Sequence, residues 1–164
     1  STGNHRKVKS AIYNSLDKLK VKSYEFKRHL ACIDSLKSYY KGSMELLDHK
    51  INKELFSLER PIYTKTNDEI PARYTNDCVV KNSIIGNGCL IEGTVENCII
   101  FRRVKVSKGA MLKDCIILQN CIIGQNAKLY NIVTDKYVDI GEYKELRGDI
   151  TIPLVVENSI RKQY

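Results

Sequence analysis

The sequence lacks the features that mark a membrane protein or a nucleic-acid-binding protein. No apolar run approaches the length that spans a membrane, and no signal peptide opens the chain. Tryptophan is absent, and there is neither a basic motif interleaved with aromatic residues nor a recognition-helix signature. The formal charge of +8 is spread along 164 residues, and attraction of phosphorylated metabolites accounts for it equally well. We therefore expect a cytoplasmic protein that binds neither a membrane nor nucleic acid.

What the sequence does contain is an internal repeat. Residues 98–114 (CIIFRRVKVSKGAMLKD) align with residues 115–131 (CIILQNCIIGQNAKLYN), so the period is 17 residues. A third copy begins at Ile132 and fades after residue 141. Upstream, residues 78–97 are interpreted as a longer variant of twenty residues, in which residues 85–89 match residues 106–110 and 123–127.

This repeat predicts stacked units that bury one continuous core between neighbours. An aliphatic residue followed four positions later by Ala or Cys suits a coil of three short strands, with Gly and Asn at corners that need positive φ. β-Branched pairs beside Gly, without a 3.6-residue stripe, exclude a helix. We therefore predict a mainly β fold, a left-handed parallel β-helix of the hexapeptide type. An antiparallel sheet with chance similarity is the alternative.

The six cysteines fit this fold better than a disulfide framework. They occupy repeat positions that other copies fill with Ile or Ala: Cys98 and Cys115 align with Ile132, and Cys89 aligns with Ala110 and Ala127. We expect buried free thiols, as in a reducing cytoplasm. No pair has C-x-x-C spacing, so no metal site is expected.

The residues before the repeat predict two helices and a linker. Apolar spacing indicates a helix over residues 6–20, and residues 21–26 suit a short strand. Ser43 is a credible N-cap for a second helix that Pro61 ends, and residues 60–77 are an extended linker. Residues 150–156 should add a terminal strand that caps the β-helix. The expected organisation is residues 1–42, a connecting helix and linker over 43–77, and the β-helix with its cap over 78–164.

Several phrases, in order along the chain, resemble those of bacterial glucose-1-phosphate adenylyltransferase (ADP-glucose pyrophosphorylase). They are residues 33–35 (IDS), 39–46 (YYKGSMEL), 61–64 (PIYT), 91–97 (IEGTVEN) and 101–106 (FRRVKV). In that family a nucleotidyltransferase domain precedes a left-handed β-helix. The resemblance implies that residues 1–42 are the C-terminal remnant of that domain, and that a piece of a longer protein is at hand. The domain's Gly-rich nucleotide loop is absent from this sequence.

One departure from the family pattern implies a noncatalytic chain. Catalytic members carry an Asp that helps to hold Mg²⁺, and His29 stands at the matching position. The spacing between Ser35 and Tyr39 also resembles the GlgD-type regulatory subunit. We therefore expect no catalytic residue and no cofactor in this chain, and no adenylyltransferase activity from it alone. The implied partner is a catalytic subunit in a homo- or heterotetramer.

The candidate site is the densest positive group in the repeat, formed by Arg102, Arg103, Lys105 and Lys108. Guanidinium groups bind phosphate bidentately, so this group is a candidate for binding a phosphorylated effector. The resemblance implies that role for Arg103 in particular. A polar corner of the coil without a ligand explains the same residues. His29 could be a catalytic base, but a surface or interdomain histidine is the simpler explanation, because no paired nucleophile accompanies it. Asp34 and Glu25 could form a carboxylate pair, but solvated charges explain them more simply.

Two other functions stay open at this point. A hexapeptide-repeat acyltransferase needs a His within the coils as general base, but all three histidines, at positions 5, 29 and 49, precede the repeat. The stronger rival is an inert scaffold for subunit assembly, which the sequence alone does not separate from a regulatory subunit.

Overall fold

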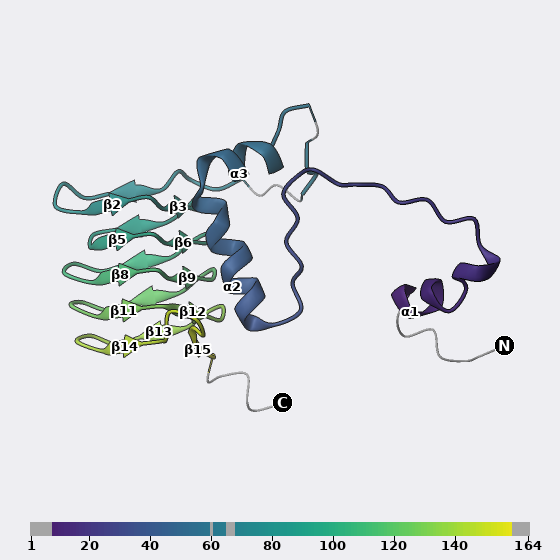
Figure 1. Cartoon of the computed structure of the whole chain (residues 1–164). Helices are drawn as coiled ribbons and strands as arrows, with labels where there is room; N and C mark the ends of the chain where they lie inside the picture. Colours follow the sequence, from purple (N-terminus) through teal and green to yellow (C-terminus); the bar gives the residue numbers. More distant parts are fainter. Residues whose placement is uncertain (1–7, 60, 65–67, 159–164) are drawn as a thin grey trace.

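The computed structural model describes residues 8–59, 61–64 and 68–158, and most of the second half of the chain is a parallel β-helix of about four turns. Its short strands form three five-stranded parallel sheets, and Figure 1 shows the coils stacked one on the next. The first sheet contains β1 (Arg73–Tyr74), β4 (Leu90–Ile91), β7 (Lys105–Val106), β10 (Ile122–Ile123) and β13 (Asp139–Ile140). The second contains β2 (Val79–Lys81), β5 (Thr94–Glu96), β8 (Met111–Lys113), β11 (Lys128–Tyr130) and β14 (Glu145–Arg147). The third contains β3 (Ile84–Ile85), β6 (Ile99–Ile100), β9 (Ile116–Ile117), β12 (Ile132–Thr134) and β15 (Leu154–Val156).

The strand register confirms the 17-residue repeat in the middle of the stack. Val106 pairs with Ile123, and Leu112 pairs with Leu129, as the alignment of residues 98–114 with 115–131 predicts. The register assigned to residues 78–97 is wrong. Ile85 pairs with Ile100 in the third sheet, and Val106 pairs with Ile91 in the first, so that coil is two residues shorter than the repeat instead of longer. Counting from the similar Gly-containing phrase had placed those residues on the wrong face.

The corners explain why such short strands can turn without long loops. Residues 82, 97, 114 and 131 form one column of left-handed backbone, and residues 88, 103, 120 and 137 form another. Most of these positions carry Asn, Asp or Gly, which tolerate positive φ. Arg103 (φ 57°) and Tyr137 (φ 60°) are the exceptions in the second column. Two bulky side chains therefore project from a corner that ordinarily favours small residues.

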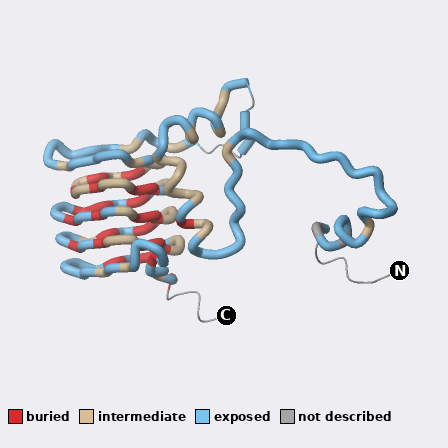
Figure 2. Tube along the Cα trace, viewed as in Figure 1, coloured by how far each residue is buried: buried red, intermediate tan, exposed pale blue. Residues whose placement is uncertain are grey.

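One continuous apolar core fills the stack, and in Figure 2 it appears as buried stretches repeated from coil to coil. All six cysteines are free, and four of them are buried. Cys98 and Cys115 lie one above the other, with the Cys115 amide 3.4 Å from the Cys98 sulfur. The alignment of Cys89 with Ala110 and Ala127 is wrong, because Leu90 pairs with Lys105 and thereby places Cys89 over Val104.

A helix covers the outer face of the third sheet. It is α2 (Leu36–Met44), followed by the 3₁₀ turn η2 (Glu45–Leu47) and by α3 (His49–Leu55). The buried Tyr40 packs against Ile99, Ile116 and Val133, and its hydroxyl donates to the carbonyl of Asp114 at 2.7 Å. These three aliphatic residues stack in register, so a single helix side chain can contact successive coils.

The prediction that Ser43 caps a helix is wrong. Ser35 caps α2, because its hydroxyl accepts from the Ser38 amide while the Ser38 hydroxyl accepts from the Ser35 amide. Ser43 therefore lies inside α2, and Asp48 caps the separate helix α3. The apolar spacing that suggested one long helix is broken between them at η2.

The first segment has less regular structure than its pattern predicts. The helix expected over residues 6–20 is confined to α1 (Val8–Tyr13) and the 3₁₀ turn η1 (Leu16–Lys18), while residues 1–7 lie outside the described part. The strand expected over residues 21–26 is not formed, and residues 19–34 are mostly exposed (Figure 2). Short helices and lone strands need tertiary contacts for stability, and Val8 remains 74% exposed here.

At the other end the predicted terminal strand forms only in part. β15 pairs with β12, but residues 150 and 152 lie in an exposed turn. Asp149 makes that turn, since its carboxylate accepts from both the amide and the hydroxyl of Thr151 at 2.7 Å. No helix in the described part of the chain is long and apolar enough to cross a membrane.

A candidate anion-binding corner

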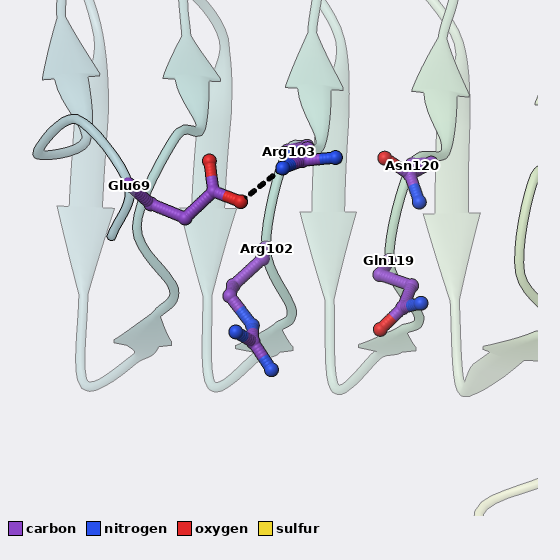
Figure 3. Close-up of a pocket in the computed structure, with 5 residues that line it drawn as sticks. All are labelled: Glu69, Arg102, Arg103, Gln119 and Asn120. Carbon is purple, nitrogen blue, oxygen red and sulfur yellow. Dashed lines mark hydrogen bonds and ion pairs between the residues drawn. The ribbon is translucent and has the colours of Figure 1, made fainter. Parts of the chain in front are cut away.

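Arg102 and Arg103 lie together at the corner between β6 and β7. They line a small pocket of about 60 Å³ with Glu69, Gln119 and Asn120 (Figure 3). The next coil supplies Gln119 and Asn120, and the Asn120 amide donates to the Arg102 carbonyl at 3.0 Å. In Figure 3 the Arg102 side chain points away from Glu69, whereas Arg103 points along the corner between Glu69 and Asn120. Two guanidinium groups and two carboxamides thus gather at one corner.

The central contact of the corner is an ion pair between Arg103 and Glu69. The hydrogen bond from Arg103 lowers the pKa of the Glu69 carboxyl below its ordinary value, so the carboxylate is ionised at neutral pH. The Glu69 side chain is only 10% exposed, but the Arg103 side chain is 58% exposed. Arg103 therefore keeps much of its side chain open to solvent while it holds Glu69.

The backbone explains how Arg103 reaches this place. Its amide donates to the Asn87 carbonyl at 3.1 Å, which fixes the corner in the left-handed conformation. Gly88 occupies the same place one coil earlier, and a Cβ there would lie 3.2 Å from Cγ of Arg103 and 3.5 Å from the Glu69 carboxylate. Glycine at position 88 thus leaves the space in which the ion pair lies.

The structure separates the four cations that the sequence groups together. Arg102 and Arg103 share the pocket. Lys105 is exposed on β7, and Lys108 lines a different pocket, with Glu92 and Asn126, at the next corner. Arg102 and Arg103 therefore remain as one compact candidate site, and Lys108 is not part of it.

The surroundings of His29 do not suit metal chemistry. Around the position where the family carries its Mg²⁺ ligand, the His29 imidazole lies 3.6 Å from the Glu45 carboxylate, and the His29 amide donates to Glu54 at 3.0 Å. Mg²⁺ requires near-octahedral oxygen ligands, so this imidazole with its paired carboxylate does not fit the ion. Within the described ranges, no three His, Cys, Asp or Glu side chains form a group that could hold a metal.

Sequence reasoning missed three of the five residues that line the pocket. Gln119 and Asn120 follow Arg102 and Arg103 by one 17-residue period, so the repeat alone could have identified them. Glu69 lies in the segment expected to be a linker, and no periodic signal connects it with Arg103. Only the folded structure shows that Glu69 pairs with Arg103.

Comparison with known proteins supports the resemblance drawn from the sequence phrases. Residues 70–150 match the family described as GlmU-like, C-terminal hexapeptide. The chain is 40% identical to the glycogen biosynthesis protein GlgD of Bacillus subtilis over 156 residues, and 54% identical to GlgD of Geobacillus stearothermophilus over 71 residues. It is also 31% identical to a glucose-1-phosphate adenylyltransferase of Acetivibrio thermocellus over 121 residues.

The three matches cover different shares of the proteins. They include 95%, 43% and 73% of this chain, respectively, and 46%, 21% and 28% of the relatives. The chain thus spans less than half the length of each of these relatives. The B. subtilis match also includes nearly all of the segment that precedes the β-helix.

Proposed function

We propose that this chain, a homologue of GlgD over 95% of its length, serves glycogen synthesis as part of a noncatalytic regulatory subunit of glucose-1-phosphate adenylyltransferase. Its partner would be a catalytic subunit, in a homo- or heterotetramer. The β-helix would support subunit assembly, and the corner at Arg103 would bind a phosphorylated metabolite. The similarity to both GlgD and adenylyltransferases supports the link to that enzyme.

The observation that carries the regulatory part is the exposed guanidinium group at a left-handed corner. Arg103 stands where neighbouring coils have Gly88 and Asn120, so the fold itself does not require a long cation at this position. Arg102 lines the same pocket, and Gln119 and Asn120 add carboxamide donors. Such a set suits a phosphate group, whose oxygens accept charge-assisted hydrogen bonds.

The test is reconstitution with a catalytic adenylyltransferase subunit from the same organism. Pyrophosphate release from ATP and glucose 1-phosphate is measured for each protein alone and for the mixture, across a series of inorganic phosphate concentrations. We expect no turnover from this chain alone and a changed phosphate response in the mixture. Sustained turnover by the chain alone would contradict a noncatalytic role.

A matched pair of variants assigns the response to the corner. Arg103→Asn removes the guanidinium but retains a residue that the same corner carries one coil later, as Asn120. Lys108→Gln removes one positive charge at a different corner. Arg103→Asn should weaken the phosphate response about three- to tenfold, whereas Lys108→Gln should leave it close to that of the wild type.

A second function, assembly without regulation, is favoured by one observation. Glu69 already pairs with Arg103, so the corner can be complete without any ligand. In that case the mixture would form a stable complex, but Arg103→Asn would leave its phosphate response unchanged. The hexapeptide acyltransferase alternative is not retained, because no histidine follows residue 49 and the coils therefore lack the base it needs.

A further inference from the structure

Glu69 occupies the position of an anion at the corner. It lies in residues 68–72, the segment that leads into β1, and its carboxylate accepts a hydrogen bond from the Arg103 guanidinium. The segment is held over the same corner by its backbone, since the Gly88 amide donates to the Ile70 carbonyl at 2.7 Å and the Arg73 amide donates to the Cys89 carbonyl at 2.8 Å. A carboxylate from the entry segment thus sits against the cation that would hold a phosphate.

We propose that Glu69 is a built-in competitor for the anion site, which a bound phosphate group must displace from Arg103, thereby freeing the side-chain tether of residues 68–72. This inference rests on the proposed phosphate-binding role of Arg103 and adds its regulation. The ligand that would bind is a phosphate dianion or a phosphomonoester. The Glu69 carboxylate and the phosphate cannot share the same guanidinium nitrogens, so binding of one lowers the occupancy of the other.

The geometry favours exchange over a permanent structural pair. The Arg103 side chain is 58% exposed, so a dissolved anion can approach it without opening the core. The ion pair joins two surface elements and lies outside the apolar core cluster. The Glu69 side chain is only 10% exposed, but water and salt reach its partner Arg103 and limit what the pair contributes to stability, so a dissolved anion can compete for the guanidinium group. Because the site is competent only when Glu69 is displaced, the apparent affinity is reduced by the fraction of molecules in which the pair is closed.

The coupling to the rest of the chain follows from where Glu69 lies. The backbone bonds of Ile70 and Arg73 hold the segment after Glu69, while Glu69 itself is tied by its side chain. Displacement would loosen residues 68–69 first and leave β1 paired with β4. Anion binding at the corner would thereby change how residues 68–72, which lead into β1, are held on the coils.

The experiment is a calorimetric titration of the full chain with inorganic phosphate at constant ionic strength. Glu69→Gln should bind phosphate about two- to fivefold more tightly than the wild type, because the neutral amide competes less well for Arg103. Asp68→Asn is the matched control: it removes one negative charge from the adjacent exposed position and should change the affinity much less. Arg103→Asn should weaken binding.

The double variant Glu69→Gln/Arg103→Asn separates competition from general repulsion. If Glu69 acts through Arg103, Glu69→Gln gives no tighter binding in the Arg103→Asn background. Equal gains from Glu69→Gln and Asp68→Asn, or a gain that persists without Arg103, would refute the competitor while leaving the anion site standing. If Arg103→Asn does not weaken binding, both the competitor and the proposed phosphate site are wrong.

Hydrogen exchange supplies a readout independent of affinity. The Gly88 amide is the reporter, because it donates to the Ile70 carbonyl at 2.7 Å directly after Glu69. Phosphate should raise exchange at this amide in the wild type, while Glu69→Gln should show the raised level without phosphate. If the ion pair is purely structural, phosphate does not change hydrogen exchange. Unchanged exchange at saturating phosphate would therefore overturn the proposal.

Discussion

Gly124 and Gly141 offer a matched test of how closely the coils are packed. They take the same place in successive coils, because Ile123 pairs with Ile140. A Cβ built on Gly124 would lie 2.6 Å from the Glu142 amide nitrogen and 2.7 Å from the Gly141 carbonyl carbon. A Cβ on Gly141 would meet only Cγ of Lys144, at 4.0 Å. The two glycines thus differ in whether a further coil lies directly against them.

The magnitudes follow from two opposing terms. Neither glycine is among the residues with positive φ, so alanine needs no strained backbone at either position. Replacing Gly by Ala at such a site stabilises a protein by about 0.4–1 kcal/mol through the unfolded chain. At Gly124 the contact with backbone atoms must also be relieved, and overpacking costs roughly 1–3 kcal/mol. We expect Gly124→Ala to lower the free energy of unfolding by about 1–2 kcal/mol. Gly141→Ala should raise it by up to about 1 kcal/mol.

Urea unfolding followed by circular dichroism measures both variants against the wild type, with the slopes compared to verify that the same transition is observed. Opposite signs for the two variants support the packing argument. Ser107 carries a side chain at the corresponding place one coil earlier. If Gly124→Ala is as stable as Gly141→Ala, the coil can relax to the spacing that it has at Ser107, and close packing does not explain the glycine.

Three further measurements test the packing of the core, the contact of α2 with the third sheet, and the burial of the thiols. Ala127→Phe inserts a ring at a fully buried small position and should cost roughly 1–3 kcal/mol or more, with a lower thermal midpoint and poorer co-purification with a catalytic subunit; wild-type behaviour in all respects would contradict the register. Tyr40→Phe removes the hydrogen bond to the Asp114 carbonyl and should cost about 0.5–1.5 kcal/mol in urea unfolding, more than the control Tyr39→Phe. Of the six free thiols, the exposed Cys32 should react at once with Ellman's reagent and the four buried ones only on unfolding; rapid native-state labelling of all six would contradict the core.

The buried thiols also set the sign of a pH effect. Burial raises the pKa of Cys89 and of Cys121 above the ordinary thiol value. As pH rises through that ordinary value, the unfolded chain releases these protons while the folded chain keeps them, so unfolding becomes easier. The free energy of unfolding should fall on the alkaline side, and replacing both residues with Ala should reduce that slope.

The fold was largely predictable because the 17-residue period can be read directly from the sequence. Buried aliphatic residues at fixed spacing fixed the coil and its interior, and Val106, Ile123 and Leu129 lie where the alignment predicts. Residues 78–97 were assigned to the wrong register because Gly-containing corners look alike in sequence. A corner phrase such as residues 85–89 does not reveal which of the three corners it forms. Helix α2 was misplaced because the Ser35 capping box competes with Ser43, and tertiary contact with the third sheet decides between them.

The candidate site was predictable only in its cations. Arg102 and Arg103 are adjacent in the sequence, but Lys108 is carried to a different corner by the turn of the coil. Charge density along a chain therefore overstates the size of a cluster in a β-helix. Glu69 could not be predicted, because it lies 34 positions before Arg103, in a segment that does not itself carry the repeat.

Two of the contacts between the described residues before the β-helix and the coils differ in character, and this difference determines which one can respond to a ligand. On the third sheet, Tyr40 is buried and packs against stacked aliphatic side chains, so its release would expose apolar surface. At the neighbouring corner, Glu69 and Arg103 form an ion pair with an exposed arginine, which salt or an anion can weaken. A phosphate at the corner would therefore release residues 68–69 before it loosened α2. The side-chain contact that holds residues 68–72 could therefore change while α2 keeps its position on the coils.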